Sequence, residues 1–156
     1  MGEGSPDRMN RGEAMSDPVI RGSCLCGGVC FEITGKPLWM SWCHCSRCRK
    51  VGGMANVTVR SEQFRWVRGR EQVTRYEPEP PSHLVRCFCR VCGSYLGEPD
   101  TSPIGFPVAA SALDDDPGVR PVLHEHVADK APWYEILDDL PQYPGHPPGF
   151  GGPSKE

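Results

Sequence analysis

Cys43-His44-Cys45-Ser46-Arg47-Cys48 lies between two further cysteine clusters, Cys24-Leu25-Cys26 and Cys87-Phe88-Cys89-Arg90-Val91-Cys92. Thiolates separated by one or two residues can converge on one tetrahedral metal ion, and pairs from distant segments can hold together a fold with a small hydrophobic core. The spacing therefore predicts metal binding, with zinc as the expected ion.

The composition limits the class of protein. A chain of 156 residues, 38% of them hydrophobic, fits one domain with a modest core. Nine cysteines are an odd number and a lower density than small disulfide-rich proteins have, so reduced or metal-bound thiols are expected. No segment resembles a signal-peptide core or a membrane span, which predicts a cytoplasmic protein without a membrane partner.

Charge is divided unevenly along the chain. Residues 36–75 contain nine Lys or Arg against two Glu, about +7, and residues 98–140 contain ten Asp or Glu against two basic residues, about −8. The basic stretch surrounds the middle cysteine cluster, where it can attract an anionic small molecule. A solvated face that pairs with the acidic half is an equal alternative. Nucleic acid is not an expected partner, because the basic residues are interleaved with aromatics only at Phe64 and Trp66.

Turn residues dominate the local pattern. The chain has 18 glycines and 17 prolines and hardly any sustained 3.6-residue apolar period, so we predict a mainly β fold of small antiparallel sheets with few short helical turns. The expected strands are 29–33, 38–42, 55–60, 72–76, 83–88 and 94–97, and the expected helical turns are 46–50 and 61–64. We expect the apolar segment 133–137 to dock on the sheets.

Three regions are expected along the chain. Residues 1–18 are predicted to be a disordered leader, residues 19–143 a zinc-binding domain, and residues 144–156 a flexible tail rich in Pro and Gly.

Two of the cysteine clusters differ in how readily their backbone brings two sulfurs onto one metal ion. Cys89-Arg90-Val91-Cys92-Gly93 is typical of a zinc knuckle, in which glycine permits the conformation that closes the loop. Cys24 and Cys26 would lie about 7 Å apart on a flat strand, so they can share an ion only if the chain bends at Gly27-Gly28.

Seven cysteines at these spacings allow one site with four protein ligands and one with three. The middle cluster, Cys43, Cys45 and Cys48, is the natural three-ligand site, and such a site leaves a coordination position open for water or substrate. By spacing alone, a fourth ligand could come from Cys87, Cys30 or His44, which would close the site and make it structural. For His44 itself we expect packing or support of the ligands rather than metal binding.

The ordered combination of four segments resembles a known family. Arg21–Val29, Cys43–Arg49, Arg86–Ser94 and Lys130–Tyr134 are similar to the glutathione-dependent formaldehyde-activating enzyme (GFA) family, which also includes centromere protein V. The resemblance spans residues 19–144.

The resemblance implies a zinc-stapled β-fold of the type called a β-tent, with two zinc ions per chain. It implies a structural zinc on Cys24, Cys26, Cys89 and Cys92, and a second, catalytic zinc on Cys43, Cys45 and Cys48. The implied activity is that of a carbon-sulfur lyase, which binds glutathione or a similar small thiol at the second zinc and acts on its adduct with a small aldehyde. Formaldehyde is the family precedent.

Charge alone suggests where the thiol substrate is held. Arg47, Arg49, Lys50 and Arg60 lie near the middle cluster in sequence and are candidates for binding the carboxylates of glutathione. The alternative function is a non-catalytic, zinc-stabilised binding module, which needs no exchangeable coordination position.

Overall fold

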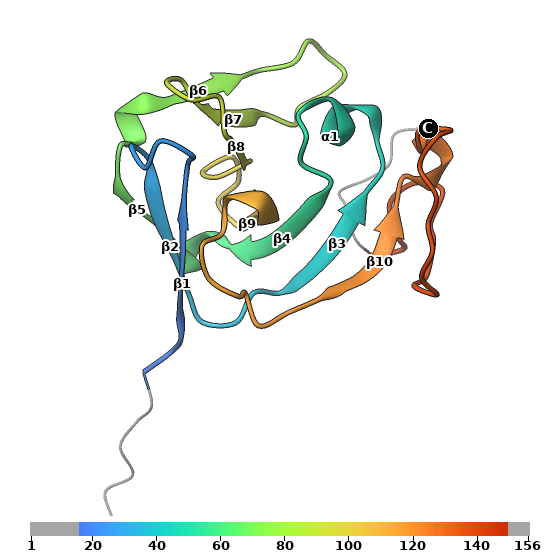
Figure 1. The fold of residues 1–156 in the computed structure, drawn as a ribbon, viewed down its shortest axis with the longest axis horizontal. Coiled ribbons are helices and arrows are strands. Elements are labelled where there is room, and N and C mark those ends of the chain that lie inside the picture. Colours follow the sequence, from blue (N-terminus) through green and yellow to red (C-terminus); the bar gives the residue numbers. More distant parts are fainter. Residues whose placement is uncertain (1–15, 150–156) are drawn as a thin grey trace, which may run out of the picture.

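The computed structural model describes residues 16–149, and within this range the chain is mainly β (Figure 1). The strands are β1 (Val19–Ser23), β2 (Cys30–Thr34), β3 (Trp39–Cys43), β4 (Ala55–Arg60), β5 (Phe64–Arg68), β6 (Val73–Tyr76), β7 (Arg86–Cys89), β8 (Tyr95–Gly97), β9 (Gly105–Ala109) and β10 (Pro121–Glu125). One helix, α1 (Ser46–Lys50), and four 3-10 turns complete the list: η1 (Ser61–Gln63), η2 (Arg70–Gln72), η3 (Ala110–Ala112) and η4 (Val127–Asp129). Within residues 16–149, no helix has the length and apolar character needed to span a bilayer.

The strands form two sheets. The smaller has the order β1-β2-β5, and the larger has the order β10-β3-β4-β9-β8-β7-β6. All pairings are antiparallel except that of β10 with β3, which is parallel. The expected mainly β fold is confirmed, and the parallel pair adds to it. A parallel partner must return by a long connection, and the chain passes through β4 to β9 between β3 and β10.

One apolar core joins both sheets. Phe31 and Ile33 on β2, and Val57 and Val59 on β4, are buried at alternate positions, as the two-residue period of a strand requires. Full burial of each such side chain stabilises the fold by about 1.5–3 kcal/mol. The ring of Phe64 on β5 lies 5.2 Å from that of Phe31 and 5.4 Å from that of Phe106 on β9, so it contacts both sheets.

Most of the expected elements lie within one to three residues of the observed ones. The six expected strands correspond to β2, β3, β4, β6, β7 and β8, and the two expected helical turns correspond to α1 and η1. The sequence did not predict β1, β5, β9 and β10. Pro107 lies inside β9 between two hydrogen-bonded neighbours, a position where proline normally argues against a strand.

The segment that follows β10 runs beside this strand. The backbone N–H of Tyr143 donates to the carbonyl of His124 at 2.8 Å, and residues 144–149 continue beside β10. Trp133 and Leu137, which were expected to dock, are 71% and 88% exposed, and Tyr134 is the half-buried aromatic of that segment. Residues 1–15 of the expected leader and residues 150–156 of the expected tail lie outside the described part of the chain.

Candidate metal centres

Four cysteines from two distant turns meet at one end of the sheets. Cys24 and Cys26 lie in the turn after β1, whereas Cys89 ends β7 and Cys92 lies in the turn that follows. One ligand atom from each lies within 4.8 Å of the others, with Cys24 Sγ 3.5 Å from Cys26 Sγ and Cys26 Sγ 3.8 Å from Cys89 Sγ. Sulfurs on one tetrahedral zinc, with bonds of about 2.3 Å, lie about 3.8 Å apart. The four cysteines therefore fit a zinc ion.

The local backbone explains why these sulfurs converge. Gly27 and Gly93 follow the two pairs with φ of 72° and 75°, a left-handed conformation that glycine adopts without strain. Ser94 links the turns, since its Oγ accepts the Leu25 N–H at 2.8 Å and lies 3.3 Å from Cys92 Sγ. The hydrogen bond from Ser94 lowers the pKa of the Cys92 thiol to about 5, which favours the thiolate that a metal binds.

The second cluster lies where β3 meets α1. Cys43 ends β3, Cys45 caps the N-terminus of α1, and Cys48 lies within that helix. All three are buried, and their sulfurs lie within 4.8 Å of one another. The Cys48 N–H donates to Cys45 Sγ at 3.4 Å, so the helix turn itself fixes the geometry of this pair. Hydrogen bonds from the Cys43 and Cys48 thiols hold the pKa of Cys45 far below that of an ordinary thiol.

A buried arginine contacts this cluster. Arg86 Nη2 lies 3.6 Å from Cys48 Sγ, and Arg86 Nη1 forms an ion pair with Glu98. Both side chains of the pair are more than nine-tenths buried. Burial raises the pKa of the Glu98 carboxyl, although the guanidinium beside it acts in the opposite direction. The cluster therefore has a fixed positive charge within reach of one sulfur.

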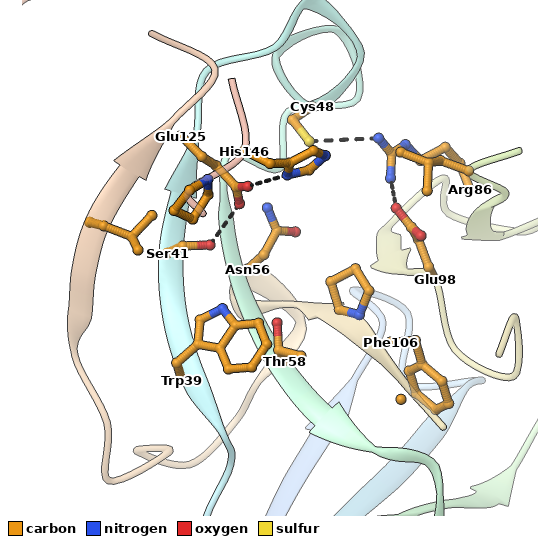
Figure 2. Close-up of a pocket in the computed structure, with 15 residues that line it drawn as sticks. Trp39, Ser41, Cys48, Asn56, Thr58, Arg86, Glu98, Phe106, Glu125 and His146 are labelled. Atoms are coloured by element: carbon orange, nitrogen blue, oxygen red, sulfur yellow. Dashed lines mark hydrogen bonds and ion pairs between the residues drawn. The ribbon is translucent and has the colours of Figure 1, made fainter. Parts of the chain in front are cut away.

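A cavity of about 300 Å³ opens beside Cys48 (Figure 2). Its walls are partly apolar and partly polar, and they include Trp39 and Phe106, Asn56 and Thr58, and the ion-paired Arg86 and Glu98. Because Cys48 is itself part of the wall, a small molecule in the cavity can approach the three-cysteine cluster.

A model of the glutathione-dependent formaldehyde-activating enzyme family matches residues 19–129. The chain belongs to this family. The crystal structure of a Rhodobacter sphaeroides protein is similar to it, with a TM-score of 0.52 and 29% sequence identity over 78% of this chain and 98% of that one. No curated protein matches the chain significantly.

In this member of the formaldehyde-activating enzyme family, the alternative ligands of the second cluster lie elsewhere. Cys87 is buried with its sulfur 3.8 Å from the Pro99 carbonyl, and burial raises the pKa of its thiol to about 11. Cys30 faces the Gly27 carbonyl at 3.5 Å. His44 points away and pairs with His124, Nε2 to Nδ1 at 2.8 Å. Among residues 16–149, no fourth Cys, His, Asp or Glu joins the three sulfurs.

The four basic candidates for substrate binding are not gathered around the cavity. Arg47 bonds to Ser82, Lys50 is exposed, and Arg60 lines a separate hollow with Leu38 and Glu62. Arg49 is half-buried on α1. None of the four lines the cavity beside Cys48. Their role in binding carboxylates stays a prediction.

Sequence reasoning missed the residues that shape the cavity wall. Arg86 directly precedes the third cysteine cluster, and its pairing with Glu98 was not predicted. The available signal was a charged residue at the start of β7 and a carboxylate twelve positions later, directly after β8. Trp39, Asn56 and Phe106 come from three different strands, and no local pattern brings them together.

Proposed function

We propose that this chain is a cytoplasmic, zinc-dependent carbon-sulfur lyase that acts on the adduct of a small thiol, such as glutathione, with a small aldehyde, such as formaldehyde. The observation that carries the proposal is the three-cysteine cluster, which lacks a fourth protein ligand among the described residues and borders a cavity. Membership of the formaldehyde-activating enzyme family supports the same reaction class.

Two zinc ions per chain are part of the proposal. Cys24, Cys26, Cys89 and Cys92 would hold a closed structural ion, and Cys43, Cys45 and Cys48 would hold an ion with one open position. A zinc ion there lowers the pKa of a bound thiol and so favours its thiolate.

The chain's own residues account for how a substrate would be held. The volume of about 300 Å³ suits the reacting end of a thiol adduct. Trp39 and Phe106 exclude water from that end, while the amide of Asn56 and the hydroxyl of Thr58 can orient its hydroxyl group. Arg86, fixed by Glu98, places positive charge beside Cys48, where sulfur carries negative charge.

The reaction breaks two bonds in the adduct. In the cleavage direction the carbon–sulfur bond of the hemithioacetal breaks and the sulfur leaves as a thiolate, while the hydroxyl group loses its proton to solvent as the aldehyde carbonyl forms. In the reverse direction the thiolate adds to the carbonyl carbon, and the oxygen takes up a proton.

Replacement of Cys48 by Ser tests the proposal. We expect Cys48→Ser to stay folded, to hold one zinc fewer than the wild type, and to lose at least a hundredfold in the rate of adduct exchange between glutathione and formaldehyde, measured by NMR. Cys30→Ser is the matched control and should keep both zinc content and rate, because Cys30 belongs to neither cluster.

A zinc-edge absorption spectrum recorded with and without glutathione completes the test. A spectral change in the wild type that is absent in Cys48→Ser supports an exchangeable position. Unchanged exchange in Cys48→Ser, or a wild-type spectrum indifferent to thiol, would instead identify a zinc-stabilised binding module.

A further inference from the structure

A different group of potential metal ligands lies at the end of β10. Glu125 is the last residue of this strand, His126 follows it, and His146 comes from the segment that runs beside β10. One ligand atom from each lies within 4.8 Å of the others. Glu125 and His146 also line the cavity beside Cys48 (Figure 2).

The two imidazole rings bring equivalent nitrogens together. Nε2 of His126 lies 3.3 Å from Nε2 of His146. Two imidazole nitrogens on one tetrahedral zinc, with bonds of 2.0–2.1 Å, lie about 3.3–3.4 Å apart. The observed separation therefore equals one edge of a zinc coordination tetrahedron.

The opposite nitrogen of each ring faces a carboxylate. His146 Nδ1 lies 2.9 Å from Glu125 Oε2, and His126 Nδ1 lies 3.8 Å from Asp129 Oδ2. The carboxylate hydrogen-bonded to His146 Nδ1 favours the proton on that nitrogen, which leaves the lone pair of His146 on Nε2. Asp129 lies beyond hydrogen-bond distance and adds negative charge beside His126. The two rings pack edge to face, with centroids 4.4 Å apart and planes 80° apart.

Backbone hydrogen bonds keep the two histidines close to each other. His126 adopts a left-handed conformation with φ of 56°, and its N–H donates to the Gly145 carbonyl at 3.0 Å. The Val127 N–H donates to the Tyr143 carbonyl at 3.0 Å. A non-glycine residue in this conformation costs about 1–2 kcal/mol, so the surrounding hydrogen bonds must hold it there. The site is thus built before any ligand arrives.

The surrounding charges favour a cation. Glu125 Oε1 accepts from Ser41 Oγ at 2.9 Å, a neutral donor, and Oε2 lies 2.9 Å from His146 Nδ1. Among residues 16–149, neither Glu125 nor Asp129 forms a salt bridge with Lys or Arg. Two carboxylates therefore lie beside the two imidazole rings.

We propose that Nε2 of His126 and Nε2 of His146 bind one zinc ion. Glu125 orients the His146 ring, Asp129 adds negative charge beside His126, and water completes the coordination. Imidazole is a ligand that zinc favours, and the site contains no thiolate, so it is chemically distinct from both cysteine clusters. It places a second type of metal centre on the wall of the cavity that reaches Cys48.

Zinc counting on the full chain tests the site. Protein already loaded with zinc is dialysed against free zinc from the micromolar to the millimolar range, and zinc per chain is measured for His126→Asn, His146→Gln and the wild type. Asn tolerates the left-handed conformation of residue 126. We expect the wild type to hold one more zinc than either variant, and Glu125→Gln to bind that zinc at least tenfold more weakly. Exposed His83 provides the control: His83→Gln should match the wild type.

Equal zinc uptake by the wild type and both histidine variants would overturn the site, and so would an added zinc whose absorption spectrum shows sulfur ligands. Either variant alone decides the question if the other fails to fold, as judged by near-ultraviolet circular dichroism. The wild type and the histidine variants have the same cysteine clusters, so zinc bound there contributes equally to both counts. The test of this site therefore does not depend on whether the proposed lyase activity is correct.

Discussion

Arg86 is a buried charge that connects the second cysteine cluster to the rest of the fold. Its guanidinium contacts Cys48 Sγ, pairs with Glu98 and lies 5.9 Å from the centre of the Tyr95 ring. We expect Arg86→Met to lower the free energy of unfolding by about 3–5 kcal/mol at neutral pH, because it leaves the Glu98 carboxylate buried without a partner. Urea unfolding measures this loss.

The pH dependence of that loss follows from Glu98. Its pKa is already raised by burial, and removal of the guanidinium raises it further. A carboxyl group with a raised pKa binds more protons in the folded than in the unfolded state, so the variant regains stability as the pH falls. Arg65→Met is the control, since Arg65 pairs with Glu32 at the surface and should cost about 0–1 kcal/mol. Equal costs for the two variants would contradict the role given to burial.

Site residues that lie close together in the sequence were predictable, whereas those that only the fold brings together were not. The three cysteine clusters could be found because one or two intervening residues already constrain where the sulfurs lie. The structure brings together the sets expected from spacing and resemblance. The cavity wall depends on Trp39, Asn56 and Glu98, which come from separate strands or strand ends. Only the strand order of the sheet brings them together.

Among the elements, β8 is short but connects two parts of the large sheet. It stands between β9 and β7, and its register with β9 rests on the pairing of Gly97 with Val108. Gly97 has a φ of 94°, and a Cβ there would lie 2.6 Å from the backbone of β9. We expect Gly97→Ala to destabilise the protein by at least about 2 kcal/mol more than a glycine substitution that meets open space.

Gly118→Ala provides that comparison. Gly118 has a similar left-handed conformation with φ of 69°, but nothing lies within 4 Å of its added Cβ. Its cost should be the conformational one alone, about 1–2 kcal/mol. Thermal unfolding of both variants separates the two effects. If they melt at the same temperature, the close approach of β8 and β9 does not limit stability.

Three of the four strands that were not predicted have weak or contrary local signals. β5 carries Arg65 and Arg68 beside its aromatic residues, so its alternation of apolar and polar positions is weak in isolation. β9 contains Pro107, and β10 joins the sheet edge through parallel pairing with β3. Tertiary partners, rather than local propensity, decide these strands.

At the scale of the molecule, the two cysteine clusters lie in different structural settings. The four-cysteine cluster joins the turn after β1 in the small sheet to the turn after β7 in the large one (Figure 1). The three-cysteine cluster lies within one local segment that runs from β3 into α1. We therefore expect loss of the first to weaken the connection between the sheets, and loss of the second to disturb one turn.

Replacement of a knuckle cysteine should therefore unfold the whole chain. The cysteine pairs lie more than 60 residues apart in sequence, and no zinc can bridge them in the unfolded chain without closing that loop. Structural zinc binding contributes about 10–16 kcal/mol of apparent free energy in zinc-finger peptides, which matches or exceeds the roughly 5–15 kcal/mol of net stability of a native protein. We expect Cys92→Ser to lose zinc and cooperative thermal unfolding together, while Cys48→Ser melts cooperatively and Cys30→Ser resembles the wild type. A Cys92→Ser protein that has lost this zinc but still melts in one sharp transition would show that the apolar core alone holds the sheets together.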